Sequence, residues 1–202
     1  MSPPPNKADA DATWKYIEAG VQGILKHPSD RGEMDMKTWM GLYTAVHNFC
    51  TVRKAVGSSP TQGCSRGNRR VAHIFEKELY ERLKQLLETH LQMIQNEARR
   101  YSKGALLDFY IKEQDRYITA AKQNNHLFRY LNRHWVKQEI KQGRKDIYDV
   151  YTLHLVLWKG VIDAATHAGV ADAVTQLMER QRNGEIIDDT LIEGILDSFG
   201  KY

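Results

Sequence analysis

Apolar side chains recur every three or four residues through most of this 202-residue chain, and this spacing constrains the fold more than any other feature. A long example runs from Val71 to Ile94, with glutamate, lysine and arginine on many of the intervening positions. Such spacing places side chains on one face of an α-helix, whereas a half-buried strand alternates with a period of two. No segment shows sustained two-residue alternation bounded by turn signals. The sequence therefore predicts an all-α protein.

The same periodicity predicts five main helices followed by two shorter ones. A weak point is expected in the fourth helix at Asn124 and Asn125. Residues 1–11 show no apolar periodicity and are expected to form a flexible tail, and the Gly-, Ser- and Pro-rich residues 57–70 are expected to form a disordered loop. The seven helices are expected at about residues 13–27, 36–56, 71–94, 102–140, 147–165, 170–182 and 189–199.

Composition is that of an ordinary globular chain, with 42% hydrophobic and 27% charged residues. No apolar run approaches the roughly 18 residues that a membrane span needs, and the first residues lack the features of a secretory signal. The two cysteines, Cys50 and Cys64, are then expected to stay reduced, as in the cytoplasm and nucleus. We expect a chain that neither crosses nor binds a membrane.

The second predicted helix carries more apolar surface than one core can use. Leu42, Ala45 and Phe49 fall on one face, and a second, adjacent face extends the apolar arc over more than half the circumference. Burial on both sides within the domain would explain this pattern, and so would a partner-binding surface rich in Trp, Tyr and Met. The second face comprises Trp39, Met40, Tyr43, Val46, His47 and Cys50.

Signatures of catalysis are weak. His126 and His134, with Asp115, could be imagined as metal ligands, but they lack the short His or Cys spacing of known metal motifs. His154 lies within the apolar fifth helix and is expected to be a hydrogen-bonded core residue. We therefore expect no catalytic residue, no metal and no cofactor.

A basic segment supports a rival hypothesis, a helical module that binds an acidic partner such as nucleic acid. The formal net charge of the whole chain is only +4, so no extended basic surface is indicated. The segment contains Arg129, Arg133, His134, Lys137, Lys141, Arg144 and Lys145.

Four segments resemble the cullin family, and in particular its cullin-1 type. They occur in the same order as in that family and together cover most of the chain. The segments are TWMGLYTAVHNFCT (38–51), ELYERLKQLLETHL (78–91), YLNRHWVKQEIKQGRKDIYDVYTLHLVLWK (130–159) and ERQRNGEIIDDTLIEGILDSF (179–199).

The resemblance implies a helical bundle in which five-helix cullin repeats stack into a solenoid. Residues 12–168 would form the first cullin repeat, and residues 169–202 would begin a second stacked repeat. Nothing in the chain resembles the C-terminal cullin region that holds the RING-box protein, so a fragment of a longer scaffold is expected.

The resemblance also implies partners and binding residues. The N-terminal cullin repeat receives a Skp-type adaptor together with an F-box protein in SCF ubiquitin ligases, and a cullin-associated exchange factor is a further possible partner. Such a chain would be a non-catalytic scaffold of the cytoplasm and nucleus, with no nucleic acid expected. Trp39 stands where the family usually has Tyr, and His47 where an aromatic residue is common. The residues carried over are Trp39, Met40, Tyr43, Val46 and His47, with Trp135 and Val136 as weaker candidates.

Overall fold

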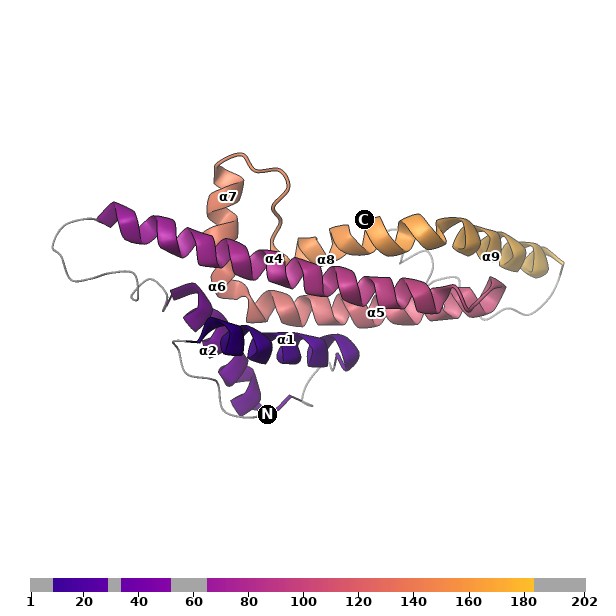
Figure 1. The fold of residues 1–202 in the computed structure, drawn as a ribbon. Helices are drawn as coiled ribbons and strands as arrows, with labels where there is room; N and C mark the ends of the chain where they lie inside the picture. Colours follow the sequence, from indigo (N-terminus) through magenta and orange to yellow (C-terminus); the bar gives the residue numbers. More distant parts are fainter. Residues whose placement is uncertain (1–8, 29–33, 52–64, 184–202) are drawn as a thin grey trace. The chain divides into compact units, whose positions relative to one another are not determined.

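The computed structural model describes residues 9–28, 34–51 and 65–183, and every regular element in these ranges is helical (Figure 1). The all-α prediction is therefore confirmed. The elements are α1 (Ala10–Lys26), α2 (Met36–Thr51), α4 (Ser65–Ala98), α5 (Lys103–Leu127), α6 (Arg129–Leu131), the π-helix η1 (Asn132–Val136), α7 (Lys137–Lys141), α8 (Val150–Trp158), the π-helix η2 (Lys159–Asp163) and α9 (Ala164–Arg182).

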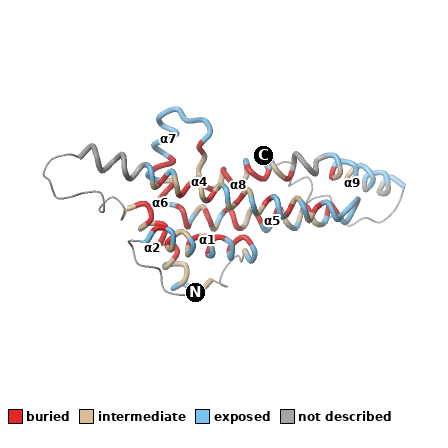
Figure 2. The backbone as a smooth tube through the Cα atoms, viewed as in Figure 1, coloured by how far each residue is buried: buried red, intermediate tan, exposed pale blue. Residues whose placement is uncertain are grey.

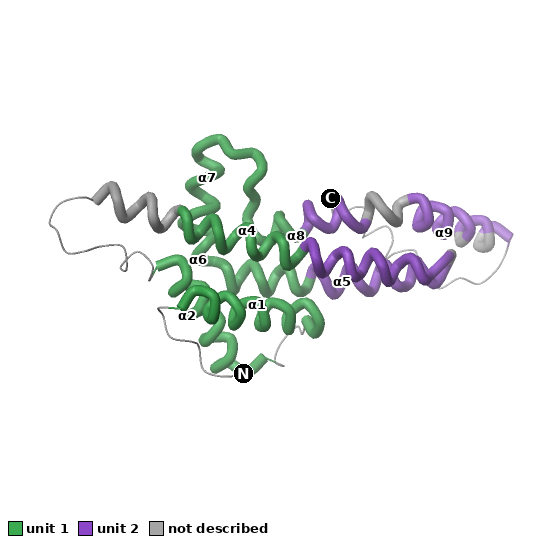
Figure 3. Tube along the Cα trace, in the orientation of Figure 1, with its two compact units in different colours: residues 1–87, 119–154 green, residues 88–118, 155–202 purple. Residues whose placement is uncertain are grey.

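The chain divides into two compact units, shown in different colours in Figure 3. Unit 1 comprises residues 1–87 and 119–154, and unit 2 comprises residues 88–118 and 155–202. Each unit thus combines segments that are distant in sequence. The boundary expected between residues 168 and 169 stays a prediction.

Unit 1 is built around the packing of α1 against α2. Ile17, Val21 and Ile24 of α1 are almost completely buried, as Figure 2 shows for the inner faces of both helices. Gly20 permits the close approach, because a Cβ atom at this position would lie 2.3 Å from Cδ2 of Leu42. The absence of a side chain at Gly20 therefore sets how closely α2 can sit on α1.

Residues 129–141 form a short helical arm, which we call the α6–α7 arm (Figure 1). The arm is anchored by Trp135, which is 1% exposed and lies against Tyr80 of α4 with ring centroids 5.0 Å apart. After α7 the chain turns back at Gly143, whose φ of +87° is strained for residues with a side chain. The arm is thus held at its base and exposed toward its tip (Figure 2).

Two side chains hold the returning chain where α8 begins. The Tyr80 hydroxyl accepts a hydrogen bond from the Tyr148 amide and donates one to the Tyr148 carbonyl, both at 3.1 Å. Asn132 Oδ1 accepts from the Val150 amide at 3.0 Å, and its amide group donates to Asn125 at 2.7 Å. The backbone groups at the start of α8 are thus paired with side chains of α4 and η1, as buried polar groups require.

Unit 2 has an aromatic core around Trp158. The Trp158 ring lies 5.8 Å from Tyr110 and 5.2 Å from Tyr117, measured between centroids. A π-helix shifts the backbone hydrogen bonds of η2, and the Gln95 side chain donates to the Val161 carbonyl there at 3.0 Å. A side chain of α4 thus supports this irregular turn.

Several predicted helix boundaries were wrong. Helix α1 begins at Ala10, not near Thr13, because Asp9 accepts a hydrogen bond from the Ala12 amide and caps it. Helix α4 begins at Ser65, inside the predicted loop, since this stretch contains no proline and its one glycine costs only about 1 kcal/mol in a helix. Residues 57–64 of that loop lie outside the described residues, as do residues 1–8 of the expected tail.

Two further differences concern helix interruptions. The break in the fourth predicted helix falls at Phe128, not at Asn124–Asn125, and the predicted gap between residues 165 and 170 does not exist. Helices α8, η2 and α9 instead form one continuous helical run, in which alanines at 164, 165 and 168 favour helix. The helix expected at residues 189–199 lies outside the described residues.

Candidate partner-binding surface

The start of α2 is fixed by Asp35. One carboxylate oxygen of Asp35 accepts hydrogen bonds from the Lys37 and Thr38 amides, and the other accepts from the Thr38 hydroxyl. The bonds from Thr38 are the main reason that the pKa of Asp35 is lowered, since they stabilise the charged carboxylate. These hydrogen bonds pair backbone amides of the first turn of α2 and so stabilise the turn that precedes Trp39.

Four of the five predicted residues on α2 reach the surface of unit 1. Met40 is 52% exposed, and Trp39, Tyr43 and His47 are partly exposed. Trp39, Tyr43 and His47 are spaced four residues apart and therefore share one side of the helix. We call the set Trp39, Met40, Tyr43 and His47 the aromatic patch.

Three predicted residues lie in the core. Val46 is 0% exposed, and Trp135 and Val136 are each 1% exposed, so none of them presents surface to a partner in this structure. For these three the prediction of direct contact needs correction. Val46 joins Leu42 on the buried side of α2. Helix α2 packs against both α1 and α6, so a larger part of its circumference is buried than packing against one helix would bury. Trp135 and Val136 hold the α6–α7 arm in place.

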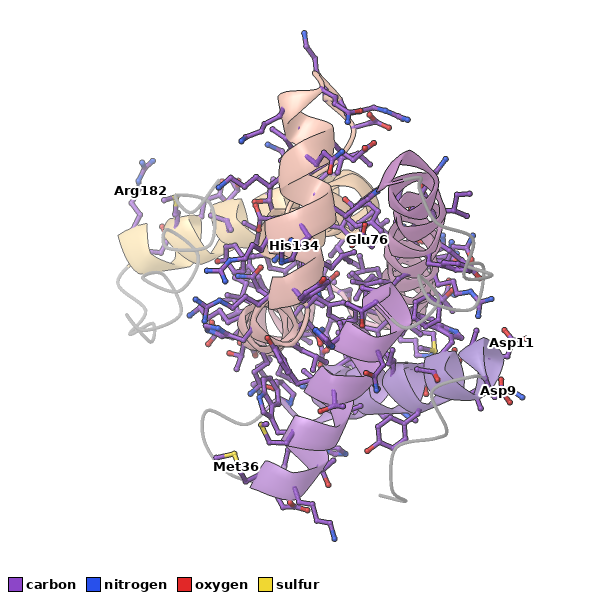
Figure 4. The ribbon with its side chains drawn as sticks, turned by 90° about the vertical axis from the view of Figure 1, so that its left-hand side faces the viewer. Asp9, Asp11, Met36, Glu76, His134 and Arg182 are labelled. Carbon is purple, nitrogen blue, oxygen red and sulfur yellow. The ribbon has the colours of Figure 1, made fainter. Side chains whose placement is uncertain are left out.

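The structure adds two residues that the sequence did not assign to this surface. His47 meets the Tyr130 ring edge-on with centroids 4.7 Å apart, and Tyr130 lies 4.3 Å from the His134 ring. Figure 4 shows α2, with Met36 near its start, and the α6–α7 arm, with His134, on the face turned to the viewer. The sequence indicated no role for Tyr130 beyond its place in the resembling segment 130–159, and His134 was weighed only as a metal ligand or part of a basic segment. Nothing in the local pattern links either residue to His47.

Tyr130 remains a hydrogen-bond donor over the whole neutral range. Burial is the main reason that its pKa is raised, and the nearby acidic groups of Glu76 and Cys50 act in the same direction. Figure 4 labels Glu76 of α4, and this residue is 7% exposed. The edge of the aromatic patch therefore offers a phenolic hydroxyl beside two imidazole rings.

The described residues offer little support for a catalytic or metal site. No group of three or more His, Cys, Asp or Glu side chains in the described ranges could hold a metal ion. His154 is 0% exposed and its Nε2 forms a hydrogen bond of 3.4 Å with the side-chain amide nitrogen of Asn124, so the prediction of a hydrogen-bonded core histidine is confirmed. None of the helices described is long and apolar enough to cross a membrane.

Comparison with known proteins places the chain in a family. A family model described as the cullin alpha solenoid domain matches residues 14–202. Cullin-1 of Schizosaccharomyces pombe is 31% identical over 189 residues, covering 93% of this chain and 24% of the relative. Cullin-1 of Dictyostelium discoideum is 28% identical over 198 residues, covering 98% of this chain and 25% of the relative. Cell division control protein 53 of Saccharomyces cerevisiae is 29% identical over 202 residues, covering 96% and 24% respectively.

The chain thus spans about a quarter of the length of these curated relatives. The match nevertheless extends over almost all of this chain and agrees with its all-helical architecture. The expected solenoid fold class is confirmed by the same family model. The chain belongs to the cullin family.

Proposed function

We propose that this chain is the adaptor-binding part of a scaffold subunit in an SCF-type cullin–RING ubiquitin ligase. Its aromatic patch binds a Skp-type adaptor that carries an F-box protein, and the F-box protein brings the substrate for ubiquitin-dependent degradation. The observation that carries the proposal is the group of large side chains on α2 that the core of unit 1 leaves accessible. The names of the relatives, cullin-1 and cell division control protein 53, support the assignment to this class of ligase.

The composition of the patch suits a protein interface. Trp and Tyr contribute large contact areas with few rotatable bonds, and Met adapts to irregular surfaces. Tyr130 and His134 add polar groups at one edge, so the surface combines an apolar centre with a polar rim. Such a surface tolerates water when free and becomes dry when a partner covers it.

The role is that of a non-catalytic scaffold. The RING-box protein binds the C-terminal region of the full-length scaffold, and a cullin-associated exchange factor competes for the scaffold. We place the protein in the cytoplasm and nucleus, which fluorescence microscopy of the tagged full-length protein would test.

The direct test is the affinity of the 202-residue chain for a purified Skp-type adaptor bound to an F-box segment, measured by isothermal titration calorimetry. Replacing Trp39 or Tyr43 by Ala is expected to raise Kd by about 30-fold, the equivalent of a hot spot worth about 2 kcal/mol. Unchanged affinity in both variants would show that the patch is not the binding site.

Matched controls separate binding from folding. Met40→Ala in the patch is paired with Met93→Ala in unit 2, because the two methionines are 52% and 56% exposed. Only the first is expected to weaken binding. Circular dichroism should show equal helicity in all variants, since none of these side chains is fully buried.

A further inference from the structure

Positive charge is concentrated in the α6–α7 arm and the turn that follows it. Residues 129–145 contain six Lys and Arg side chains and one carboxylate, Glu139, which gives this segment a formal net charge of +5. The whole chain carries +4, so the remaining residues have a net charge of −1. The arm and its turn therefore account for all of the positive excess of the chain.

The cations of the arm form one line. Arg129, Arg133, Lys137 and Lys141 are spaced four residues apart and all are exposed, and we call them the cationic ridge. In a straight α-helix each step of four residues drifts by about 40° around the axis. The π-helix η1 occupies the middle of this stretch, and its wider turn reduces the drift.

The π-helix η1 also aligns the side chains on the buried side of the arm. Leu131, Trp135 and Glu139 follow the same four-residue spacing and are at most 2% exposed. The arm thus has one anchored side and one charged side. Without the π-helix, the ridge would wind further toward the anchored side.

The ridge is not neutralised within the described part of the chain. Arg144 is paired with Glu139 and Asp146, and Arg82 with Glu78 and Asp11, but the four ridge residues form no such ion pair with any described residue. Like charges four residues apart on a helix destabilise it. Carboxylates supplied by a partner would remove this repulsion.

The ridge continues directly from the aromatic patch. Tyr130 and His134 each follow a ridge residue by one position, and Tyr130 contacts His47 of the patch. One partner covering the patch would therefore also meet the first residues of the ridge.

We propose that the cationic ridge binds a carboxylate-rich segment of the same protein that covers the aromatic patch. This inference rests on the proposed function, in which that protein is the adaptor. A protein is favoured over nucleic acid because Ile140 is 50% exposed at the tip of the arm and Met40 is 52% exposed in the patch. Protein surfaces that bind nucleic acid are strongly positively charged. Outside residues 129–145 this chain has a net charge of −1, so the rest of the chain would add no net positive charge to such a surface.

The test compares two double variants of the 202-residue chain with the same total charge. Arg133→Gln with Lys137→Gln removes two charges from the ridge, and Lys112→Gln with Lys122→Gln removes two exposed charges from helix α5. Association rates with the adaptor–F-box complex are measured by stopped-flow fluorescence from about 50 to 500 mM NaCl. The ridge variant is expected to associate about three- to tenfold more slowly at low salt, with a weaker salt dependence, because steering acts mainly on association. Equal rates for the two double variants would overturn the inference.

A second probe tests the cationic ridge separately from the proposed function. If the wild-type chain fails to bind the adaptor complex, the proposed function fails, and the ridge is then judged with a synthetic glutamate-rich peptide. Amide shifts in NMR spectra are expected at residues 129–141 on addition of that peptide, and their absence would overturn the inference. Tighter binding of a single-stranded or duplex oligonucleotide, lost in the ridge variant, would overturn it in favour of nucleic acid.

Discussion

Two glycines of α1 should respond oppositely to the same substitution. A Cβ atom at Gly20 would lie 2.3 and 2.6 Å from the two δ carbons of Leu42, whereas a Cβ atom at Gly23 would meet nothing within 4 Å. Both glycines lie in the same helix, three residues apart, so their helical context is similar. The pair Gly20→Ala and Gly23→Ala therefore isolates the packing of α1 on α2.

The expected magnitudes follow from two opposing effects. Alanine in place of glycine favours a helix by roughly 0.5–1 kcal/mol, and Gly23→Ala should gain stability of this size. At Gly20 the same gain is opposed by overpacking, which typically costs about 1–3 kcal/mol, because Leu42 is 0% exposed and has little room to move. The two variants should then differ by about 1–3 kcal/mol in the free energy of unfolding.

Thermal unfolding followed by circular dichroism measures this difference. For a chain of this size each kcal/mol shifts Tm by about 2–4 °C, so Gly20→Ala should melt about 2–12 °C below Gly23→Ala. Gly20→Ala should also weaken adaptor binding, since a displaced α2 moves the aromatic patch. Equal Tm values for the two variants would refute the close packing of Leu42 on Gly20.

Two further predictions concern ionisable groups. Tyr80→Phe removes both hydrogen bonds to Tyr148 and should destabilise the protein by about 2–4 kcal/mol in urea unfolding, as expected when two part-buried backbone groups lose their partner. Burial raises the pKa of Tyr80 from its unfolded value near 10 to about 12. The resulting contribution to folding stability is therefore present below about pH 10 and is lost as the pH rises from about 10 to 12. Alkaline unfolding of Tyr80→Phe should lack this loss. Asp35 has a lowered pKa, so its capping of α2 is present above the unfolded value near 4 and is lost as pH falls through the folded value. Asp35→Asn, which retains a capping oxygen but does not ionise, should abolish this acid-dependent loss of α2 helicity, and an unchanged acid limb would contradict the role of the cap.

The helices were largely predictable because periodicity is a local property. Phe75, Leu79 and Leu83 repeat at helical spacing, and the gap expected between residues 140 and 147 falls in the connection from α7 to α8. Helix ends were less predictable. The cap at Asp9 and the π-helices η1 and η2 depend on hydrogen bonds that apolar spacing does not encode.

The candidate site was predictable in part. The excess of apolar side chains on α2 indicated a helix with accessible apolar surface, and four of the five residues chosen there are at least partly exposed, while their contact with a partner stays a prediction. Val46 was misplaced because its burial depends on packing against α1 and α6 together, and α6 is distant in sequence. Trp135 and Val136 are conspicuous in sequence, yet they serve to anchor the arm.

By itself, the sequence determined that the chain is helical, that α2 carries surplus apolar surface, and that positive charge gathers between residues 129 and 145. Only the tertiary structure decided which faces of these helices are accessible. It placed Tyr130 between His47 and His134, and the π-helix η1 aligned the cationic ridge opposite the anchored side of the arm. The physical reason is that spacing along a chain fixes angles around a helix axis, whereas exposure depends on which other helices pack against it.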